Sequence, residues 1–507
     1  MHGKKIINNS LISIIYRITI LLIGFVTRKV FIVYLGEEIL GLNSLYGNLL
    51  DLLNLADLGI GVAVQYQLYE PLVKKDIEKL SKIISAAKRI YNFIGLFVFV
   101  SGFLLSFGIQ FLIKESAYPL WFIRLSFLIS VMGTASSYFF VERKLFLQAN
   151  EEVGIVNIAD LCAKVLIVIV SLFFTIQFKN YFIYLSVNVL YGLLSNLFTY
   201  YVFRKKYPEI KSDANDIQIE MGSLLSNLKN VIPMKLSNYV YNSTDNIIIS
   251  KVLGLTLVAV YSNYMTIING IMSVEYLIGN VLTASLGKIV KEAEYGAEKV
   301  YHTYLLYQYI QFLFTGFCTI ILWNVCNPFI TIWLGEKFTL DKTAFVLLVI
   351  EFYIHSMYQP AYVMYGSTGK FAEDRVVTFF SALINIIISI ILVVQIGLAG
   401  VIIGTIVTDI YIWVVRSYQI VRSYFGEHFL KYAIKMLVYT LGVVAGCILS
   451  DWISTKIIVG YLMFEIIIKG IICVIISLFV MLTISARSKE FKMMMNYIKG
   501  SLLYRKE

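Results

Sequence analysis

VVTFFSALINIIISIILVVQIGLAGVIIGTIVTDIYIWVV, residues 376–415, contains a single charged side chain, Asp409. A helix needs about 20 predominantly apolar residues to cross the hydrocarbon core of a bilayer. The stretch is therefore long enough for two crossings, and the break between them falls near residue 396. It predicts a pair of membrane-spanning helices over residues 374–395 and 397–420.

The rest of the chain contains further apolar runs of similar length. Of the 507 residues, 59% are hydrophobic and 15% are charged, whereas a soluble domain carries about 25% charged residues. So few charges cannot make a water-facing surface, and we expect an all-α integral membrane protein with about 14 transmembrane helices. The other predicted spans are residues 11–35, 41–66, 91–113, 118–141, 153–177, 181–203, 224–250, 257–285, 303–334, 343–366, 430–450 and 458–484.

The positions of the basic residues predict the orientation of these spans. Most of the 43 Lys and Arg residues fall in alternate connecting segments or in the tail after residue 486. Basic residues gather in cytoplasmic loops, so we expect an even number of spans with both termini in the cytoplasm. The net charge of +11 is then explained by the cytoplasmic face, and no nucleic-acid partner is expected.

Two stretches of the sequence resemble each other at a constant offset of 218 residues. Tyr34-Leu-Gly36 is followed by Gly41-Leu-Asn-Ser-Leu-Tyr46, and Val252-Leu-Gly254 is followed by Ala259-Val-Tyr-Ser-Asn-Tyr264. The same offset aligns Gly61 with Gly279. Each stretch lies at the junction of a predicted helix pair, which indicates two lobes of six helices in the same orientation.

This repeat predicts the domain organisation. Two parallel repeats with a cleft between them are typical of transporters that work by alternating access, and we expect a V-shaped transporter rather than an enzyme. The predicted domains are an N-terminal lobe over residues 1–210, a C-terminal lobe over 211–422, and two added helices with a basic tail over 423–507.

Several motifs in these helices resemble a known family. They are Arg28-Lys-Val-Phe-Ile-Val-Tyr-Leu-Gly36, Asp57-Leu-Gly-Ile-Gly61, Asn242-Ser-Thr-Asp-Asn-Ile-Ile-Ile-Ser250 and Tyr261-Ser-Asn-Tyr264. Their order and spacing resemble the polysaccharide-type flippases of the multidrug, oligosaccharidyl-lipid and polysaccharide flippase superfamily. The resemblance covers nearly the whole chain.

The resemblance implies a substrate and a cellular location. Members of that family carry oligosaccharide linked to undecaprenyl diphosphate from the cytoplasmic to the outer leaflet of the bacterial plasma membrane. Their products feed the assembly of O-antigen, capsule or exopolysaccharide. The implied partners are this lipid-linked glycan, membrane lipid, and the polymerase and glycosyltransferases of the same pathway; we expect a monomer.

Cationic residues in the first predicted helix are candidates for binding the diphosphate. Arg17 and Arg28 are eleven residues apart, which places them on the same helical face. Arg can offer a bidentate fork to a phosphate group. The alternative is contact with lipid headgroups, which applies most to Arg28 and Lys29 near the outer end of the helix.

Polar residues also form stripes along the second, seventh and eighth predicted helices. Such stripes either line a hydrated cavity or hold helices together. We expect Asp57 and Asp245 either to offset nearby cations or to bind a coupling ion, H⁺ or Na⁺; no metal site or other cofactor is expected. The predicted translocation cavity comprises Arg17, Arg28, Lys29, Asn54, Asp57, Lys235, Asn242, Asp245, Asn263 and Asn269.

Other intramembrane charges have the spacing of pairs along one helix. Asp160 with Lys164, Glu351 with His355 and Glu465 with Lys469 are each four residues apart. We interpret His355 as a histidine satisfied in the core, and a role in proton relay is the alternative.

Two other functions stay open at this point. A cation-coupled multidrug extruder of the same superfamily is one, and the expected helices after residue 423 and the cationic residues argue against it. A membrane-embedded polysaccharide-synthesis enzyme is the other, but the four histidines are isolated and the sequence shows no phosphate loop or nucleophile motif.

Overall fold

The computed structural model describes residues 2–57, 59–214, 217–226, 239, 243–291, 297–368, 371–456 and 462–503. This part of the chain is built from helices and contains no β-strand, which confirms the all-α prediction. It forms two compact units, residues 1–263 (unit 1) and residues 264–507 (unit 2). The predicted domain boundaries at 210 and 422 stay a prediction.

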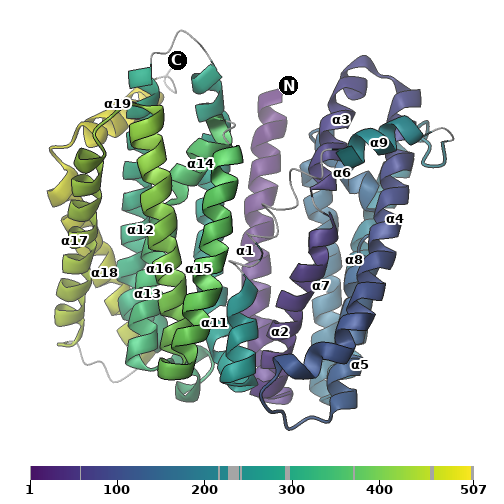
Figure 1. Cartoon of the computed structure of the whole chain (residues 1–507), viewed down its shortest axis with the longest axis horizontal. Helices are drawn as coiled ribbons and strands as arrows, with labels where there is room; N and C mark the ends of the chain where they lie inside the picture. Colours follow the sequence, from purple (N-terminus) through teal and green to yellow (C-terminus); the bar gives the residue numbers. More distant parts are fainter. Residues whose placement is uncertain are drawn as a thin grey trace. The chain divides into compact units, whose positions relative to one another are not determined.

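Unit 1 contains the N-terminal helices (Figure 1). They are α1 (His2–Tyr34), α2 (Glu37–Asn54), η1 (Leu55–Asp57), α3 (Ile60–Lys74), α4 (Ile77–Gly108), η2 (Ile109–Leu112), α5 (Leu120–Ser136), α6 (Val141–Ala149), α7 (Val153–Phe178), α8 (Tyr181–Lys206) and α9 (Gln218–Ser226). Residues 243–252 form a further helical segment, and α11 (Leu255–Lys291) begins in unit 1 and continues into unit 2.

The remaining helices belong to unit 2 (Figure 1). They are α12 (Ala297–Trp333), η3 (Glu336–Phe338), α13 (Lys342–Met357), α14 (Gln359–Thr368), α15 (Phe371–Ile396), α16 (Leu398–Tyr418), the π-helix η4 (Gln419–Tyr424), α17 (Phe429–Ser454), α18 (Leu462–Ser485) and α19 (Lys489–Leu503).

The helices have the length and composition of a multi-pass membrane protein. Nine helices in the described residues are long and apolar enough to cross a bilayer, and α5 with α6, bent by 45°, makes a tenth candidate. Each predicted span except 224–250 coincides with a described helix or with two helices separated by a short break. Most of 224–250 lies outside the described residues.

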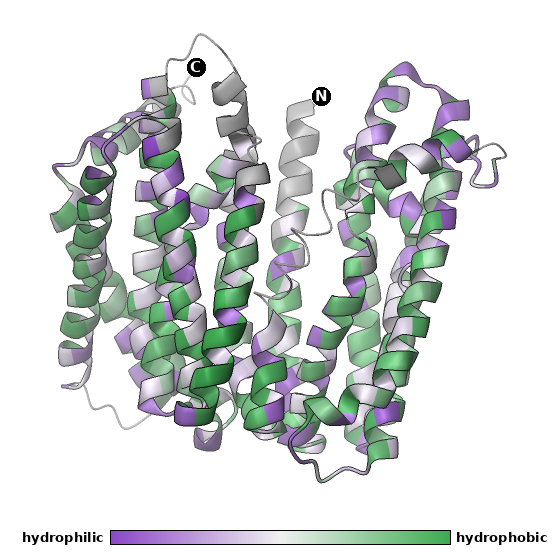
Figure 2. Cartoon of the chain, viewed as in Figure 1, coloured by the Kyte–Doolittle hydropathy of each residue, from purple (hydrophilic) through white to green (hydrophobic). Residues whose placement is uncertain are grey.

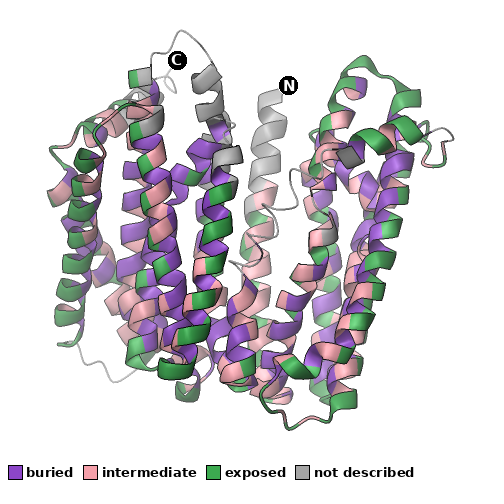
Figure 3. Ribbon diagram, viewed as in Figure 1, coloured by how far each residue is buried: buried purple, intermediate pink, exposed green. Residues whose placement is uncertain are grey.

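Many of the exposed side chains on these helices are apolar, as expected of helices that span a membrane (Figures 2 and 3). Large apolar side chains such as Phe93 on α4, Ile391 on α15 and Ile475 on α18 are more than half exposed. In a soluble protein such surfaces would mark an interface, but on spanning helices they are the surface that contacts lipid. Many of the fully buried side chains within unit 1 are also apolar, and Leu42, Leu45 and Phe127 are examples.

Helices α15 and α16 pack with unusually close backbones. Gly400 and Gly404 are four residues apart on α16, the spacing of the Gly-x-x-x-Gly packing motif. A Cβ atom added at Gly400 would lie 2.3 Å from the carbonyl carbon of Leu392, and one at Gly404 would lie 2.9 Å from the backbone nitrogen of Ser389. Only glycine therefore permits this contact.

The segment after α8 is fastened to α4. The backbone N–H groups of Lys211 and Ala214 donate to the hydroxyls of Ser81 and Ser85, at 3.1 and 2.9 Å. Lys88 Nζ lies 2.6 Å from Asp213 Oδ1, and this hydrogen-bonded pairing lowers the pKa of the Asp213 carboxyl. The segment that follows α8 is therefore a packed part of unit 1 up to residue 214.

Candidate functional site

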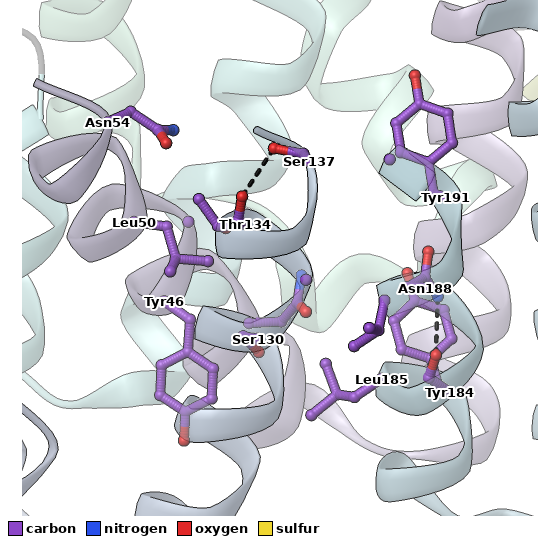
Figure 4. A pocket seen from close by; sticks show the side chains of 15 residues that line it. Tyr46, Leu50, Asn54, Ser130, Thr134, Ser137, Tyr184, Leu185, Asn188 and Tyr191 are labelled. Carbon is purple, nitrogen blue, oxygen red and sulfur yellow. Dashed lines mark hydrogen bonds between the residues drawn. The ribbon is translucent and has the colours of Figure 1, made fainter. Parts of the chain in front are cut away.

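A cavity of about 400 Å³ lies within unit 1 between α2, α5 and α8 (Figure 4). Each helix supplies residues three or four positions apart, which is the spacing of a single helical face. The lining residues are Asn43, Tyr46, Gly47, Leu50 and Asn54 of α2, Ser130, Gly133 and Thr134 of α5 with the adjoining Ser137, and Tyr184, Leu185, Asn188, Val189, Tyr191 and Gly192 of α8.

The chemistry of this lining is polar, aromatic and uncharged. Three tyrosines and three asparagines are combined with serine and threonine hydroxyls, and none of the lining residues carries a formal charge. Hydroxyl and amide groups can both donate and accept hydrogen bonds, and tyrosine adds an apolar ring face. The cavity therefore suits a neutral ligand with many hydroxyl groups better than it suits a cation.

Internal hydrogen bonds hold several of these side chains in place. The Tyr46 hydroxyl is 2.9 Å from the Ile123 carbonyl oxygen, to which it donates. Asn188 Nδ2 donates to the Tyr184 carbonyl and Ser137 Oγ to the Thr134 carbonyl, at 2.8 and 2.7 Å (Figure 4). A lining fixed in this way loses little conformational entropy when a ligand binds.

The helix formed by α2 and α3 is broken beside the cavity. α2 ends at Asn54, η1 carries Asp57, and Gly59 has a φ of 84°, a left-handed conformation that favours glycine. The Tyr138 hydroxyl donates to Asn54 Oδ1 at 3.0 Å and the Tyr91 hydroxyl to Asp57 Oδ1 at 2.8 Å. In a membrane a broken helix is tolerated where protein groups or a hydrated cavity surround it.

Cationic residues lie close to the α8 face of the cavity. Lys164 Nζ is 4.8 Å from the ring centroid of Tyr191, which lines the cavity. Lys144 Nζ is 2.6 Å from Asp160 Oδ1 and donates to Ser195 Oγ at 2.7 Å. Two lysines thus accompany one carboxylate, and the surplus of positive charge favours an anionic group next to the polar cavity.

This arrangement corrects one pairing expected from sequence. Asp160 pairs with Lys144 on α6, sixteen residues away, and not with Lys164 one turn further along α7. The expected pair of Glu465 and Lys469 is confirmed at 2.6 Å. Spacing along one helix could not reveal the contact with α6, because that contact depends on how α5 and α6 bend.

The ten predicted cavity residues are distributed over several places. Only Asn54 lines the described cavity, and Asp57 is at the helix break beside it. Arg28 Nη1 donates to Asn263 Oδ1 at 2.9 Å and to Ser262 Oγ at 3.0 Å, so this predicted pair is brought together by α1 and α11. The buried Asp245 accepts a hydrogen bond from the Tyr261 hydroxyl at 3.3 Å.

Three of the other predicted residues lie elsewhere in the described part of the chain. Arg17 is half-buried on α1, Lys29 is exposed on α1, and Asn269 is exposed on α11 in unit 2. Lys235 and Asn242 lie outside the described residues.

Sequence reasoning missed most of the lining. The residues it did not single out include Tyr46, Tyr184, Asn188 and Tyr191, together with Lys144 beside the cavity; Lys164 was considered only as a partner of Asp160. A signal was present on α8, where Tyr184, Asn188 and Tyr191 recur at helical spacing. It was hidden by composition, because the chain contains 36 tyrosines.

Comparison with known proteins is consistent with this architecture. Residues 6–290, more than half of the chain, match the model of a family described as polysaccharide biosynthesis protein. No curated protein matches the chain by sequence.

Several solved structures share the fold. Lipid II flippase MurJ in an inward closed conformation aligns with a TM-score of 0.64 at 14% identity, covering 94% of this chain and 98% of MurJ. An inward-facing multidrug resistance MATE family transporter of the MOP superfamily gives 0.62 at 15% identity, covering 81% and 98%. A MOP superfamily transporter from Pyrococcus furiosus, described by the reverse polarity of its binding pocket, gives 0.55 at 15% identity, covering 84% and 97%.

Proposed function

Because the chain belongs to the polysaccharide biosynthesis protein family, we propose that it flips oligosaccharide linked to undecaprenyl diphosphate across the plasma membrane. The substrate enters from the cytoplasmic leaflet and leaves in the outer leaflet, by alternating access. Its glycan then serves the assembly of a cell-surface polysaccharide such as O-antigen, capsule or exopolysaccharide. The protein acts as a transporter and not as an enzyme.

The observation that carries this proposal is the polar cavity of unit 1. Its volume of about 400 Å³ lies within the range of small-molecule sites, about 300–1,000 Å³, and suits a part of a glycan. The tyrosine faces and the asparagine and serine groups match the apolar faces and hydroxyl groups of sugars. A drug extruder that binds organic cations would be served better by an acidic lining, which this cavity lacks among its described residues.

The lysines next to the same cavity provide a place for the diphosphate. Lys164 lies over the Tyr191 ring, and Lys144 forms an ion pair with Asp160. Half-buried Arg17 lies on α1, which packs against α7, the helix that carries Lys164. We assign these cations to the diphosphate and the lining to the sugars.

The remaining elements of the proposal rest on the positions of the basic residues and on the resemblance to the flippases. Both termini lie in the cytoplasm, and the protein works as a monomer between the glycosyltransferases that build the glycan and the polymerase that uses it. A coupling H⁺ or Na⁺ at Asp57 or Asp245 would provide the driving force. Asp57→Asn and Asp245→Asn should then abolish the dependence of flipping on the ion gradient while normal expression is retained.

The test fills the cavity by a substitution at a glycine that has free space around its Cβ position. Gly47 lines the cavity and a Cβ added there has no atom within 4 Å, so Gly47→Trp should place an indole ring in the cavity. Gly470→Trp on α18 is the matched control, because its added Cβ is equally free of neighbours. Both variants are purified and reconstituted into liposomes with a fluorescent, short-chain diphosphate-linked oligosaccharide in the inner leaflet.

Arrival of the glycan in the outer leaflet is measured by its cleavage with an added glycosidase. We expect flipping by the wild type and by Gly470→Trp, and at least a ten-fold slower rate in Gly47→Trp. Equal rates in the two variants would overturn the assignment of the cavity. Transport of a cationic dye in place of the glycan would support the extruder, and chemical change of the glycan on the protein would support the enzyme.

A further inference from the structure

A half-buried arginine lies on the surface of unit 1 where α4 ends and α5 begins. Arg124, in the first turns of α5, donates from Nη2 to Gln110 Oε1 of η2 at 3.0 Å. Its Cζ lies 5.6 Å from the ring centroid of Phe107 on α4. Within the described residues these are its two side-chain partners, and neither carries a negative charge. The guanidinium is thus held in place without being neutralised.

Other shielded cations of the chain have a carboxylate at close range. The pairs, with distances of 2.6 or 2.7 Å, are Lys144 with Asp160, Arg416 with Asp374, and Lys469 with Glu465. A charged side chain on a membrane-spanning helix is costly, and it is usually paired or functional. The positive-inside rule does not account for Arg124 either, because we expect the N-terminal end of α5 at the outer face. The missing anion is therefore expected to come from outside the chain.

The helices that carry this arginine present apolar side chains outward. Leu104 and Phe107 of α4 and Trp121 and Leu125 of α5 are between 44% and 63% exposed. Each helix repeats these side chains at a spacing of three or four residues, so each forms a continuous outward stripe. On helices that span a membrane, such stripes contact acyl chains. Arg124 therefore lies beside a surface that is already suited to lipid tails.

Aromatic rings around the start of α5 indicate the depth of this surface in the bilayer. Tyr118 stacks on Phe122 with a centroid distance of 4.6 Å, and Trp121 stacks on Phe182 at 6.1 Å. Tryptophan and tyrosine gather at the level of the lipid headgroups, where one end of the ring is apolar and the other is hydrated. This depth places the Arg124 guanidinium at the level of the lipid phosphates.

The hydrogen-bond donors next to these stripes suit an oxyanion. A guanidinium only donates, so the oxygen of the exposed Gln110 amide faces Arg124 and the amide nitrogen keeps its two N–H groups for another acceptor. Arg124 uses Nη2 for this contact, and its Nη1 group remains to donate. Arginine binds phosphate with short, charge-assisted hydrogen bonds. A phosphate group attached to apolar chains satisfies both the donors and the stripes, whereas a small soluble anion satisfies the donors alone.

We propose that Arg124 and Gln110 bind the phosphate headgroup of an anionic phospholipid, whose acyl chains lie along the exposed stripes of α4 and α5. The expected orientation puts this lipid in the outer leaflet. It bridges α4 and α5 at the end of the bundle where the chain provides no ion pair to Arg124. The site is separate from the polar cavity, which α5 lines further along at Ser130 and Thr134, and it does not depend on the proposed glycan transport.

The test uses Trp121 as a reporter, since it is three residues from Arg124 and 61% exposed. The four other tryptophans are replaced by phenylalanine; they are Trp323, Trp333, Trp413 and Trp452. The full-length protein is reconstituted into vesicles of phosphatidylglycerol and phosphatidylcholine, in which one lipid and then the other has brominated acyl chains that quench tryptophan. The two quenching curves give the preference of the site for phosphatidylglycerol. If this parent protein does not accumulate, the difference between wild type and Trp121→Phe supplies the same signal.

We expect phosphatidylglycerol to be preferred by about five-fold, the factor that one basic residue near an anionic membrane surface contributes. Arg124→Gln should abolish this preference, Arg124→Lys should keep most of it because the charge remains, and Gln110→Leu should reduce it. Lys469→Gln is the control, because that cation is paired with Glu465, and it should leave the preference unchanged.

Three results would overturn the proposal. They are equal quenching by the two lipids in the parent protein, an unchanged preference in Arg124→Gln, and displacement of phosphatidylglycerol by a small added fraction of a prenyl diphosphate. The last result would assign the site to the transported lipid instead of a phospholipid. The first measurement needs no change at Arg124, so it decides the proposal even if Arg124→Gln does not fold.

Discussion

Replacement of Gly400 by alanine tests the packing of α15 against α16. The added methyl carbon would lie 2.3 Å from the Leu392 carbonyl carbon and 2.4 Å from its oxygen, whereas ordinary contact begins at 3.4 Å. Because these are backbone atoms, no side-chain rotation can relieve the overlap. The two helices must therefore move apart by about 1.1 Å.

The expected cost follows from three contributions. Overpacking of this kind costs about 1–3 kcal/mol. Separation of the helices also strains two hydrogen bonds between them, Asn385 to Thr405 at 3.1 Å and Ser389 to the Val401 carbonyl at 3.4 Å, each contributing about 0.6 kcal/mol in a membrane protein. Alanine gains about 1 kcal/mol over glycine as a helix former. The net loss in the free energy of unfolding is about 1–3 kcal/mol.

The unfolding of unit 2 can be followed with a dye that fluoresces when it reacts with a thiol. Cys326, Cys447 and Cys473 are buried and should react on unfolding, whereas the exposed Cys162 and the half-buried Cys318 are replaced by serine in every variant. The expected loss corresponds to a fall in Tm of about 2–12 °C for a unit of this size. Gly470→Ala is the control, because its new methyl group meets no atom within 4 Å. If Gly400→Ala melts at or above the temperature of this control, the close approach of the helices is refuted.

Three further predictions concern charged residues. Asp374→Asn leaves Arg416 buried without its carboxylate and should lower the free energy of unfolding by about 3–5 kcal/mol, measured by the same melts. Asp213→Asn should lower the free energy of unfolding by at most about 1 kcal/mol at pH 7. Because the pKa of Asp213 is lowered in the folded protein, its carboxylate stabilises the fold fully above the unfolded-state pKa of about 3.9, and this stabilisation disappears as the pH falls through the lower folded-state pKa. The wild type and the variant should therefore be equally stable in strong acid. Lys164→Met should raise the glycan concentration for half-maximal flipping by about ten-fold, from the loss of a charge-assisted contact of about 1.5 kcal/mol, whereas Lys469→Met on α18 should not.

The fold could be predicted from the sequence because two simple signals agree. Apolar runs of about 20 residues mark the spans, and the alternation of basic segments tests their number independently. What these signals could not show is where a span breaks. Gly59 interrupts the second predicted span, and Phe140, with a φ of 66°, marks the bend before α6. A hydropathy average passes over both, because a single residue with unusual backbone geometry hardly changes the composition of its window.

Much less of the candidate site could be predicted from the sequence. Charged residues inside spans attract attention because they are costly there, and this led to Arg28 and Asp57. Arg28, however, donates hydrogen bonds to Ser262 and Asn263, and Asp57 accepts one from Tyr91. The cavity is lined instead by uncharged residues on three helices, which carry no comparable signature. Their meeting depends on how α2, α5 and α8 pack, and this is information that no single helix contains.

The predicted repeat allows corresponding positions of the two units to be compared. Gly61 in unit 1 and its repeat partner Gly279 in unit 2 occupy matching environments, since a Cβ at either would lie 3.2 or 3.3 Å from a tyrosine hydroxyl, that of Tyr91 or Tyr307. Ser44 and Ser262, also 218 residues apart, are joined by a hydrogen bond of 3.1 Å. The two glycines thus have similar surroundings, as the predicted repeat requires. In unit 1 an uncharged cavity lies between α2, α5 and α8, whereas in unit 2 the buried His355 and Asp409 lie 3.5 Å apart. The side chains that fill the two interiors have therefore diverged further than the glycine contacts that hold their helices together.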